Sequence, residues 1–356
     1  MEIEYSGDPC ANQLPRASVE RFEELRPTPH ERSELGDNTD YLSWEYGYES
    51  SRWYDSGELV KLDPGEFTHF QSHRDAVEGP YEKCLCIFSG RGVLRTEDSD
   101  VRLEQFDAVL VPPNAAYQIG NTSTETLWFG WWASVGDDDL SDASRTDPPD
   151  RPGFRREYDR ILATRAEQGL PTPPDFDGDF DGDTDESRPT PSVVRFSETR
   201  PKTFGAAPEI GATEDRPDWI YSFPDSQWFS QCTLIRLDPG AFVGFHAHFE
   251  NEGPAEEIYW VLNGKARLQT EYRDTTLHQF DCAFFPTGCM HTMGNVGTER
   301  VWVAAWLSKG GRAGEFDIEE LETSERPQIR EQFERVMAAR KKRGLSLPPN
   351  VDVTLR

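Results

Sequence analysis

Residues 280–295 read FDCAFFPTGCMHTMGN, and residues 106–121 read FDAVLVPPNAAYQIGN. Both stretches begin with Phe-Asp, carry a proline at the seventh place and end with Gly-Asn. They differ at the twelfth place, where the later stretch has His291 and the earlier one has Tyr117. A frame repeated this closely indicates a duplicated unit in which only one copy has the imidazole.

The repeat extends over nearly the whole chain. Residues 51–73 align without gaps on residues 226–248, and residues 151–174 align on residues 326–349. The spacing of about 175 residues is the length of a whole domain and not of a solenoid repeat. A tandem duplication is therefore predicted.

Three segments follow from this duplication. We predict an N-terminal domain over residues 1–174, an acidic Asp/Gly linker over residues 175–192 and a C-terminal domain over residues 193–356. The linker begins DFDGDFDGDTDES, which resembles a calcium loop, but no register supplies both the central glycine and the final bidentate glutamate. A solvated linker is the better interpretation, and the acidic stretch 137–150 is interpreted in the same way.

Each copy shows many short segments rich in Val, Phe, Tyr and Trp, bounded by Pro-Gly, Asn-Gly and Ser-Gly turns. This pattern predicts an all-β fold, with an antiparallel barrel or sandwich in each copy. One amphipathic helix is expected to close each copy, because apolar residues there follow helical spacing. They are Tyr158, Ile161 and Leu162 in the first copy, and Phe333, Val336 and Met337 in the second.

The chain of 356 residues has 65 acidic and 37 basic side chains, a formal net charge of −28, and only seven lysines. This charge argues against nucleic acid and anionic membranes as partners, and a small-molecule substrate is expected instead. An acidic, lysine-poor surface is typical of halophile proteins. The N-terminus, MEIEYSGDPC, has no apolar signal-like run, and no segment reaches the length of a membrane span, so a cytoplasmic location is predicted. A homodimer is left open.

Residues 240–264 read GAFVGFHAHFENEGPAEEIYWVLNG. His246 and His248 are two apart in a strand-like stretch, so both rings are expected on one face. Glu257 follows nine residues later, and His291 lies after a Pro-x-Gly turn. Three imidazoles and one carboxylate directed into one barrel could hold a divalent metal with open positions for substrate.

These residues resemble the two motifs of the cupin superfamily. The first motif is matched by Gly240, His246, His248, Glu257 and Gly264, and the second by Pro286, Gly288, His291 and Asn295. Two departures occur: eight residues separate His248 from Glu257, and Phe280 replaces the opening glycine of the second motif. The long gap leaves Glu256 as an alternative ligand to Glu257.

The resemblance covers nearly the whole chain as a bicupin. It implies two antiparallel jelly-roll barrels, each with a pocket at one mouth, and an intact half that carries the reaction. In the first copy Gln71, His73 and Tyr117 stand at the histidine positions, and the carboxylate position falls on Glu82 or Lys83 depending on how it is counted. An amide, a phenol and a lysine are poor metal ligands, so the first copy is expected to have lost the ion.

One divalent metal per chain is therefore expected, with Fe(II) favoured and Mn, Ni or Zn as alternatives. The preferred hypothesis is a non-haem dioxygenase acting on a small aromatic or dicarbonyl substrate. A metal-dependent isomerase, lyase or decarboxylase of a small carboxylate or sugar acid is the second hypothesis, and a non-catalytic small-molecule-binding bicupin is the third.

Strand parity suggests the lining of the substrate pocket. Phe242 is expected on the face of His246, Tyr259 on the face of Glu257, and Met293 on the face of His291. Tyr259 could act as a proton donor, although a packing role is the plainer alternative. Cys289 precedes His291 and is expected to be a buried thiol.

Overall fold

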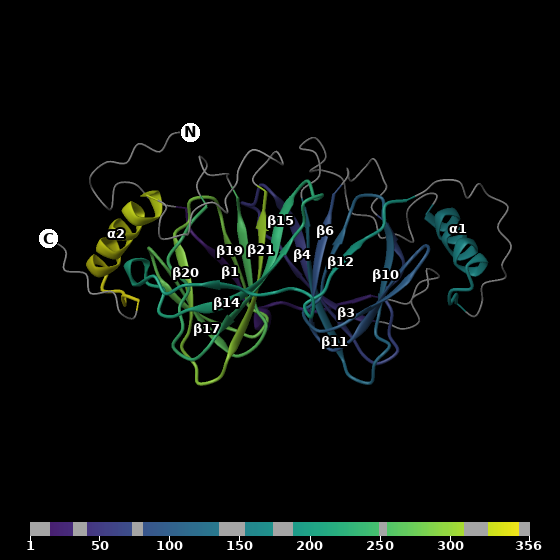
Figure 1. Ribbon diagram of the computed structural model, residues 1–356, viewed down its shortest axis with the longest axis horizontal. Helices are drawn as coiled ribbons and strands as arrows, with labels where there is room; N and C mark the ends of the chain where they lie inside the picture. Colours follow the sequence, from purple (N-terminus) through teal and green to yellow (C-terminus); the bar gives the residue numbers. More distant parts are fainter. Residues whose placement is uncertain are drawn as a thin grey trace. The chain divides into compact units, whose positions relative to one another are not determined.

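The computed structural model of the chain describes residues 15–30, 41–72, 81–134, 154–173, 188–248, 255–309 and 327–348. The acidic stretch 137–150 and residues 175–187 of the predicted linker lie outside these ranges. The chain forms two compact units, each made of antiparallel strands and one α-helix (Figure 1). The N-terminal unit consists of Arg26–Gly47 and Tyr54–Glu198; the C-terminal unit consists of Met1–Leu25, Tyr48–Trp53 and Thr199–Arg356.

The N-terminal unit contains a seven-stranded and a four-stranded antiparallel sheet within its described residues. In spatial order the larger sheet is β12 (Ser192–Val194), β9 (Ala108–Val111), β6 (Lys83–Ser89), β11 (Leu127–Ser134), β4 (Tyr54–Leu62), β3 (Tyr41–Tyr46) and β2 (Thr28–His30). The smaller sheet is β5 (Gln71–Ser72), β10 (Ala116–Gly120), β7 (Gly92–Thr96) and β8 (Asp100–Leu103). Alternate residues of both sheets form one apolar core that includes Leu85, Val109 and Ile119.

The C-terminal unit repeats this plan. In spatial order its larger sheet is β1 (Ser18–Glu20), β19 (Cys282–Phe285), β16 (Glu257–Val261), β21 (Val301–Ser308), β15 (Phe229–Leu237), β14 (Arg216–Ser222) and β13 (Lys202–Phe204). The smaller sheet is β18 (Asp274–His278), β17 (Lys265–Thr270) and β20 (His291–Asn295). Short 3-10 helices lie at η1 (Phe22–Glu24) and η4 (Pro208–Ile210).

The two copies exchange their first strands. Strand β1 begins the first repeat but pairs with β19 of the C-terminal unit, where Val19 lies opposite Ala283. Strand β12 begins the second repeat but pairs with β9 of the N-terminal unit, where Val193 lies opposite Val109. Each larger sheet therefore ends in a strand from the other copy's sequence.

The Phe-Asp pair repeated in the sequence holds these exchanged strands. Asp281 accepts hydrogen bonds from Arg21 Nη1 at 2.6 Å and from the backbone N–H of Phe22 at 3.0 Å. Asp107 accepts the same two bonds from Arg195 and Phe196, also at 2.6 and 3.0 Å. Since both aspartates are almost fully buried, each bond is shielded from competing water.

The phenylalanines before these aspartates also contact the exchanged segments. Phe280 and Phe106 adopt positive φ angles of 66° and 72°. The ring of Phe280 meets that of Phe22 edge-on at 5.4 Å, and Phe106 meets Phe196 in the same way at 5.3 Å. A left-handed backbone is uncommon for a residue other than glycine, so the ring contact accompanies a strained backbone position.

Helices α1 (Phe154–Glu167) and α2 (Pro327–Lys342) each follow the strands of one copy (Figure 1). Helix α1 buries Ile161 and Leu162 against Ala116 of β10, and α2 buries Val336 and Met337 in a cluster with Phe245. A glycine at positive φ lies two residues after each helix, Gly169 at 70° and Gly344 at 69°. The next backbone N–H closes back on the carbonyl of Arg165 or Arg340, a helix C-cap that favours glycine.

Those two arginines also anchor the helices. The side chains of Arg165 and Arg340 are 1% and 0% exposed, and Arg165 Nη2 donates to Asp100 at 2.7 Å. Arg340 pairs in the same way with Asp274. A buried cation is tolerated here because carboxylate and carbonyl oxygens accept its N–H groups.

The prediction of an all-β fold of two antiparallel units, each followed by a helix, is confirmed. Among the described residues, no helix combines the length and the apolar character that a membrane crossing requires.

Candidate metal centre

The segment that carries His246 and His248 pairs with β20 through an irregular register. Phe242 lies opposite Gly294, and four residues later His246 lies opposite His291, which is only three residues before Gly294. One strand therefore has an extra residue, as in a β-bulge, and its side chains change faces between the two bridges. The bulge directs the imidazoles of His246 and His291 toward one another, with ring centroids 4.3 Å apart.

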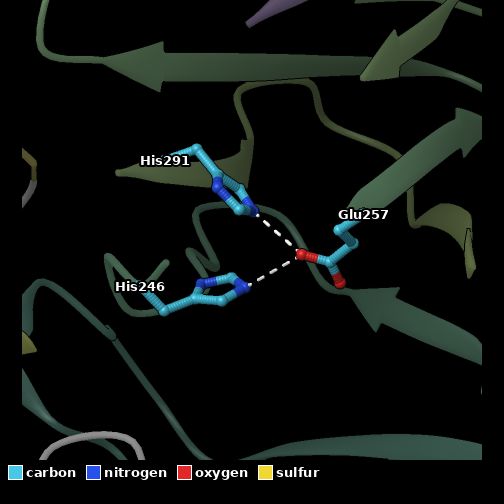
Figure 2. Close-up of side chains that lie close together, drawn as sticks. All are labelled: His246, Glu257 and His291. Atoms are coloured by element: carbon cyan, nitrogen blue, oxygen red, sulfur yellow. Dashed lines mark hydrogen bonds and ion pairs between the residues drawn. The ribbon is translucent and has the colours of Figure 1, made fainter. Parts of the chain in front are cut away.

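Glu257 begins strand β16 and points toward these rings (Figure 2). Its Oε2 atom lies 3.3 Å from Nε2 of His246, 3.3 Å from Nε2 of His248 and 3.1 Å from Nε2 of His291. All four residues predicted as ligands are thus brought together around one carboxylate oxygen. One ligand atom each from His246, Glu257 and His291 lie within 4.8 Å of one another.

Glu256 points the opposite way, as the next residue on a strand does. Its carboxylate accepts hydrogen bonds from Ser51 Oγ at 2.6 Å and from the backbone N–H groups of Arg52 and Trp53. Of the two glutamates that the sequence left open, Glu257 is the one at the cluster. Glu256 instead fastens the segment Tyr48–Trp53 of the first repeat to the C-terminal unit.

The hydrogen bonds of two imidazoles fix their tautomers. Nδ1 of His246 lies 2.9 Å from the carbonyl oxygen of Gly244, and Nδ1 of His291 lies 2.8 Å from that of Cys289. A carbonyl oxygen only accepts, so each Nδ1 must carry a proton, and in a neutral ring Nε2 is then a bare lone pair. This is the arrangement in which backbone groups orient metal-binding histidines.

The charges at the cluster favour a bound cation. Burial, and then the nearby His246, lower the pKa of His291 from 6.5 to about 4, so its ring is neutral at pH 7. Burial raises the pKa of Glu257, but its close polar contacts with the three imidazoles outweigh burial and hold its pKa well below the usual value. A neutral Nε2 lone pair of His291 then faces a carboxylate oxygen at 3.1 Å. Because lone pairs repel, a divalent cation between these atoms suits the donor set.

Tyr259 and Met293 adjoin the cluster. The Tyr259 hydroxyl lies 3.3 Å from Nε2 of His246, and the residue is 1% exposed. Burial and then the charge of Glu257 raise the pKa of this phenol well above its usual value, so it stays protonated. Met293 is buried in the same core, and Phe285 stacks on the His291 ring at 3.7 Å.

Phe242 is placed elsewhere. Its ring lies over Gly294, where an added Cβ would come within 2.2 Å of the ring, so glycine is required for this approach. Phe242 lines a separate cavity of about 350 Å³ together with Arg267 and Gln269. On a continuous strand Phe242 would share the face of His246, but the extra residue before His246 shifts Phe242 away from the face of the imidazoles.

Cys289 contributes through its backbone. Its carbonyl oxygen holds His291 Nδ1, while burial raises the pKa of its thiol from 9.0 to about 12. The thiol therefore stays protonated and is a poor ligand. The other described cysteines, at 84, 86, 232 and 282, are also buried and free.

The sequence reasoning missed an ion pair on β14. Arg216 donates from Nε and Nη2 to the carboxylate of Asp218 at 2.8–3.1 Å, and the side chains of Arg216 and Asp218 are 12% and 3% exposed. Extending the repeat alignment upstream would have found it, because residues 41–46 read YLSWEY and residues 216–221 read RPDWIY. The shared Trp and Tyr fix the alignment, and the charged pair occurs in the second copy alone.

The N-terminal unit has a different cluster at the matching place. Gln71 lies opposite Tyr117, as His246 lies opposite His291, and Lys83 starts β6 as Glu257 starts β16. Tyr117 donates to Gln71 Oε1 at 3.1 Å, and Lys83 Nζ donates to the same oxygen at 3.3 Å. The Lys83 ammonium also lies 3.7 Å from the ring centre of Trp131. Two hydrogen-bond donors share one acceptor oxygen here, so the cluster does not favour a bound metal. His73 lies outside the described residues.

Residues 233–306 match the family described as "Cupin domain". A comparison with curated protein sequences gives no match. Among solved structures, oxalate decarboxylase from Lactobacillus farciminis, determined as a formate complex, is similar at 14% identity and a TM-score of 0.55, over 85% of this chain and 88% of that one. Oxalate decarboxylase from Bacillus subtilis, described with Mn(II) centres, is similar at 15% identity and a TM-score of 0.55, over 85% and 79%.

A third similar structure is the protein Ylba from E. coli, at 12% identity and a TM-score of 0.52, over 88% of this chain and all of that one. Likeness at this level of identity shows the fold alone. The chain thus has a cupin fold, with a cluster of His and Glu side chains of a metal-binding kind in the C-terminal unit.

Proposed function

We propose that the chain is a metal-dependent enzyme in which His246, His248, Glu257 and His291 hold one divalent ion. The observation that carries this proposal is the convergence of three Nε2 atoms on Glu257 Oε2 at 3.1–3.3 Å, with two of the rings fixed in the metal-binding tautomer. Only one of the four ligands is anionic, so a bound divalent ion keeps positive charge.

We further propose that the substrate is a small carboxylic acid and that the reaction is of the lyase or decarboxylase type. A bound ion would supply Lewis-acid polarisation to a chelating oxygen of such a substrate. The protonated Tyr259 hydroxyl, 3.3 Å from His246 Nε2, would donate a hydrogen bond to that oxygen. The buried core around Met293 and Phe285 limits the access of water. Manganese is the first metal to test, because a structurally similar protein has Mn(II) centres.

A dioxygenase with Fe(II) is the second candidate. This candidate is supported by the apolar and aromatic side chains around the cluster. Phe285 stacks on His291, and Met293 lies in the same apolar core as Phe285. These side chains suit an aromatic or dicarbonyl substrate. The two candidates share the same four ligands and differ in the metal and in the use of oxygen.

Elemental analysis tests the metal, and substrate screens then separate the reactions. The wild type, purified without a metal-binding tag, is expected to contain about one divalent ion per chain. The cluster of Gln71, Lys83 and Tyr117 in the N-terminal unit is not expected to hold a second ion, because its donors already bond to its acceptor oxygen. Carbon dioxide release from small carboxylic acids without oxygen consumption would support the decarboxylase. Stoichiometric oxygen uptake would support the dioxygenase, and a protein without metal after reconstitution would contradict both.

A further inference from the structure

The face on which Arg216 and Asp218 lie follows from the register of the larger sheet. Asp218 lies opposite Ile235, Ile235 opposite Val303, and Val303 opposite Val261. Directly paired residues point to one face of an antiparallel sheet, and the last three of these belong to the apolar core inside the C-terminal unit. Asp218, and Arg216 two residues earlier on the same strand, therefore face the interior that contains the candidate metal centre.

Asp218 binds only one edge of the Arg216 guanidinium. Nε and Nη2 bind Asp218, and the ring of Phe204 lies 5.1 Å from the guanidinium carbon. Among the residues that the structure describes, Nη1 has no hydrogen-bond partner. A largely covered guanidinium held along one edge thus keeps a fixed donor edge available, which is the geometry that binds a carboxylate.

The pair acts electrostatically on the cluster. The charges of His246 and Glu257 affect the pKa of Asp218, which burial raises. Arg216 and Asp218 in turn both affect the pKa of the Tyr259 phenol. The pair and the cluster thus lie in the same interior of the C-terminal unit and act on each other's charges.

The duplicated chain provides an internal comparison. Ser43 lies opposite Val60 in the N-terminal unit, as Asp218 lies opposite Ile235, so Tyr41 and Ser43 occupy the places of Arg216 and Asp218. The charged pair is present in the unit with the His and Glu cluster and is replaced in the unit without it. A pair needed only for folding would be expected in both copies, because both fold alike.

We propose that Arg216, positioned by Asp218, binds the carboxylate of the substrate beside the metal. This inference rests on the proposed function and adds the residue that recognises the acid. Since Asp218 neutralises Arg216, the pair adds no net charge, and the free Nη1 edge selects for a carboxylate over a neutral amide of the same shape.

Acetate binding tests this assignment, with acetamide as the neutral probe. Each probe is titrated into metal-loaded protein and followed by calorimetry and, with Mn(II), by the line shape of the electron paramagnetic resonance spectrum. Replacing Arg216→Met is expected to weaken acetate binding about tenfold or more, with the metal content unchanged, because a charge-assisted hydrogen bond is lost. Arg216→Lys should recover part of the affinity, and Asp218→Asn should weaken acetate binding less than Arg216→Met does.

The control is Tyr41→Phe at the matching place in the N-terminal unit, which should leave acetate binding unchanged. Equal acetate affinity in wild type and in folded, metal-loaded Arg216 variants would overturn the assignment. If Arg216→Met does not fold, Arg216→Lys and Asp218→Asn decide the question by the same comparison. Absence of metal from the wild type would instead refute the proposed function, so the two failures are distinguishable.

Discussion

Lys83 occupies in strand β6 the register position that Glu257 occupies in strand β16. Lys83 lies opposite Val111 and Ala133, and Glu257 lies opposite the matching residues Phe285 and Leu307. The first copy therefore has an internal ammonium where the second has the carboxylate at the centre of the His and Glu cluster.

This relationship predicts that a second metal site can be rebuilt. The triple variant Lys83→Glu, Gln71→His and Tyr117→His restores one carboxylate and two imidazoles at matching places. The metal content is expected to rise from about one to about two ions per chain, because the carboxylate and imidazole ligand atoms now come together without the Lys83 ammonium and the Tyr117 hydroxyl. Elemental analysis measures this rise. The single variant Lys83→Met should stay at one ion, and a folded triple variant with an unchanged content would contradict the idea.

Glu257→Gln and Glu256→Gln form a matched pair, since the two carboxylates are adjacent and face opposite ways. Glu257→Gln is expected to lower metal affinity by at least the 10- to 100-fold typical of disturbing a metal's supporting groups, because it removes the one anionic ligand. Glu256→Gln should keep the metal and lower thermal stability, since the carboxylate bonds to Ser51, Arg52 and Trp53 are weakened. Competition with a chelator gives the affinities. Equal metal loss in both variants would argue against Glu257 as the ligand.

Acid should destabilise the metal-free protein through His291. Its pKa is about 4 in the fold and 6.5 without the fold's influence, so the unfolded chain takes up this proton first as the pH falls. Stability from this group is complete above pH 6.5 and is lost between pH 6.5 and 4, by about 3 kcal/mol for a shift of this size. Denaturant unfolding at several pH values measures the loss.

The matched control for this pH dependence is Tyr117 in the N-terminal unit. Burial raises the pKa of its phenol well above the usual value, so it does not titrate in the acid range. His291→Gln should therefore flatten the acid dependence, and Tyr117→Gln should leave its slope intact. A slope that is the same in wild type and in His291→Gln would refute the assignment.

Asp281→Asn should loosen the exchanged strand β1. The carboxylate binds Arg21 Nη1 and the backbone N–H groups of Phe22 and His278, and the residue is 3% exposed. Replacing a buried, charge-assisted acceptor by an amide is expected to cost about 2 kcal/mol. Hydrogen exchange should report faster exchange in residues 18–24 of this variant and not of Asp107→Asn, whose effect should fall on residues 192–198. Protection that does not change would show that strand pairing alone holds the segment.

Much of the fold could be predicted from the sequence because a pattern that recurs in both copies is more informative than the same pattern in one copy. Shared turns and alternating apolar residues indicate the barrels, and helical spacing at Tyr158 and Ile161 indicates the helices. The four ligand positions follow from motif spacing, which the fold brings together at Glu257.

The remaining features depend on contacts that local pattern does not contain. The place of Phe242 depends on one extra residue in the pairing, and a bulge leaves no periodic signal. The exchange of β1 and β12 depends on which edge accepts a three-residue strand, and such short strands carry little information about their partners. The Arg216–Asp218 pair is visible only when the two copies are compared residue by residue.

The strand exchange determines which parts of the duplicated chain can be lost without harm to the rest. Strand β1 and the segment Tyr48–Trp53, both encoded in the first repeat, complete the C-terminal unit that carries the His and Glu cluster. These supports do not involve Gln71, Lys83 or Tyr117, so substitutions at those places leave them intact. Deleting the first repeat would remove an edge strand and the partner of Glu256 from the second. The first repeat is thus a structural requirement of the second, whatever its own pocket binds.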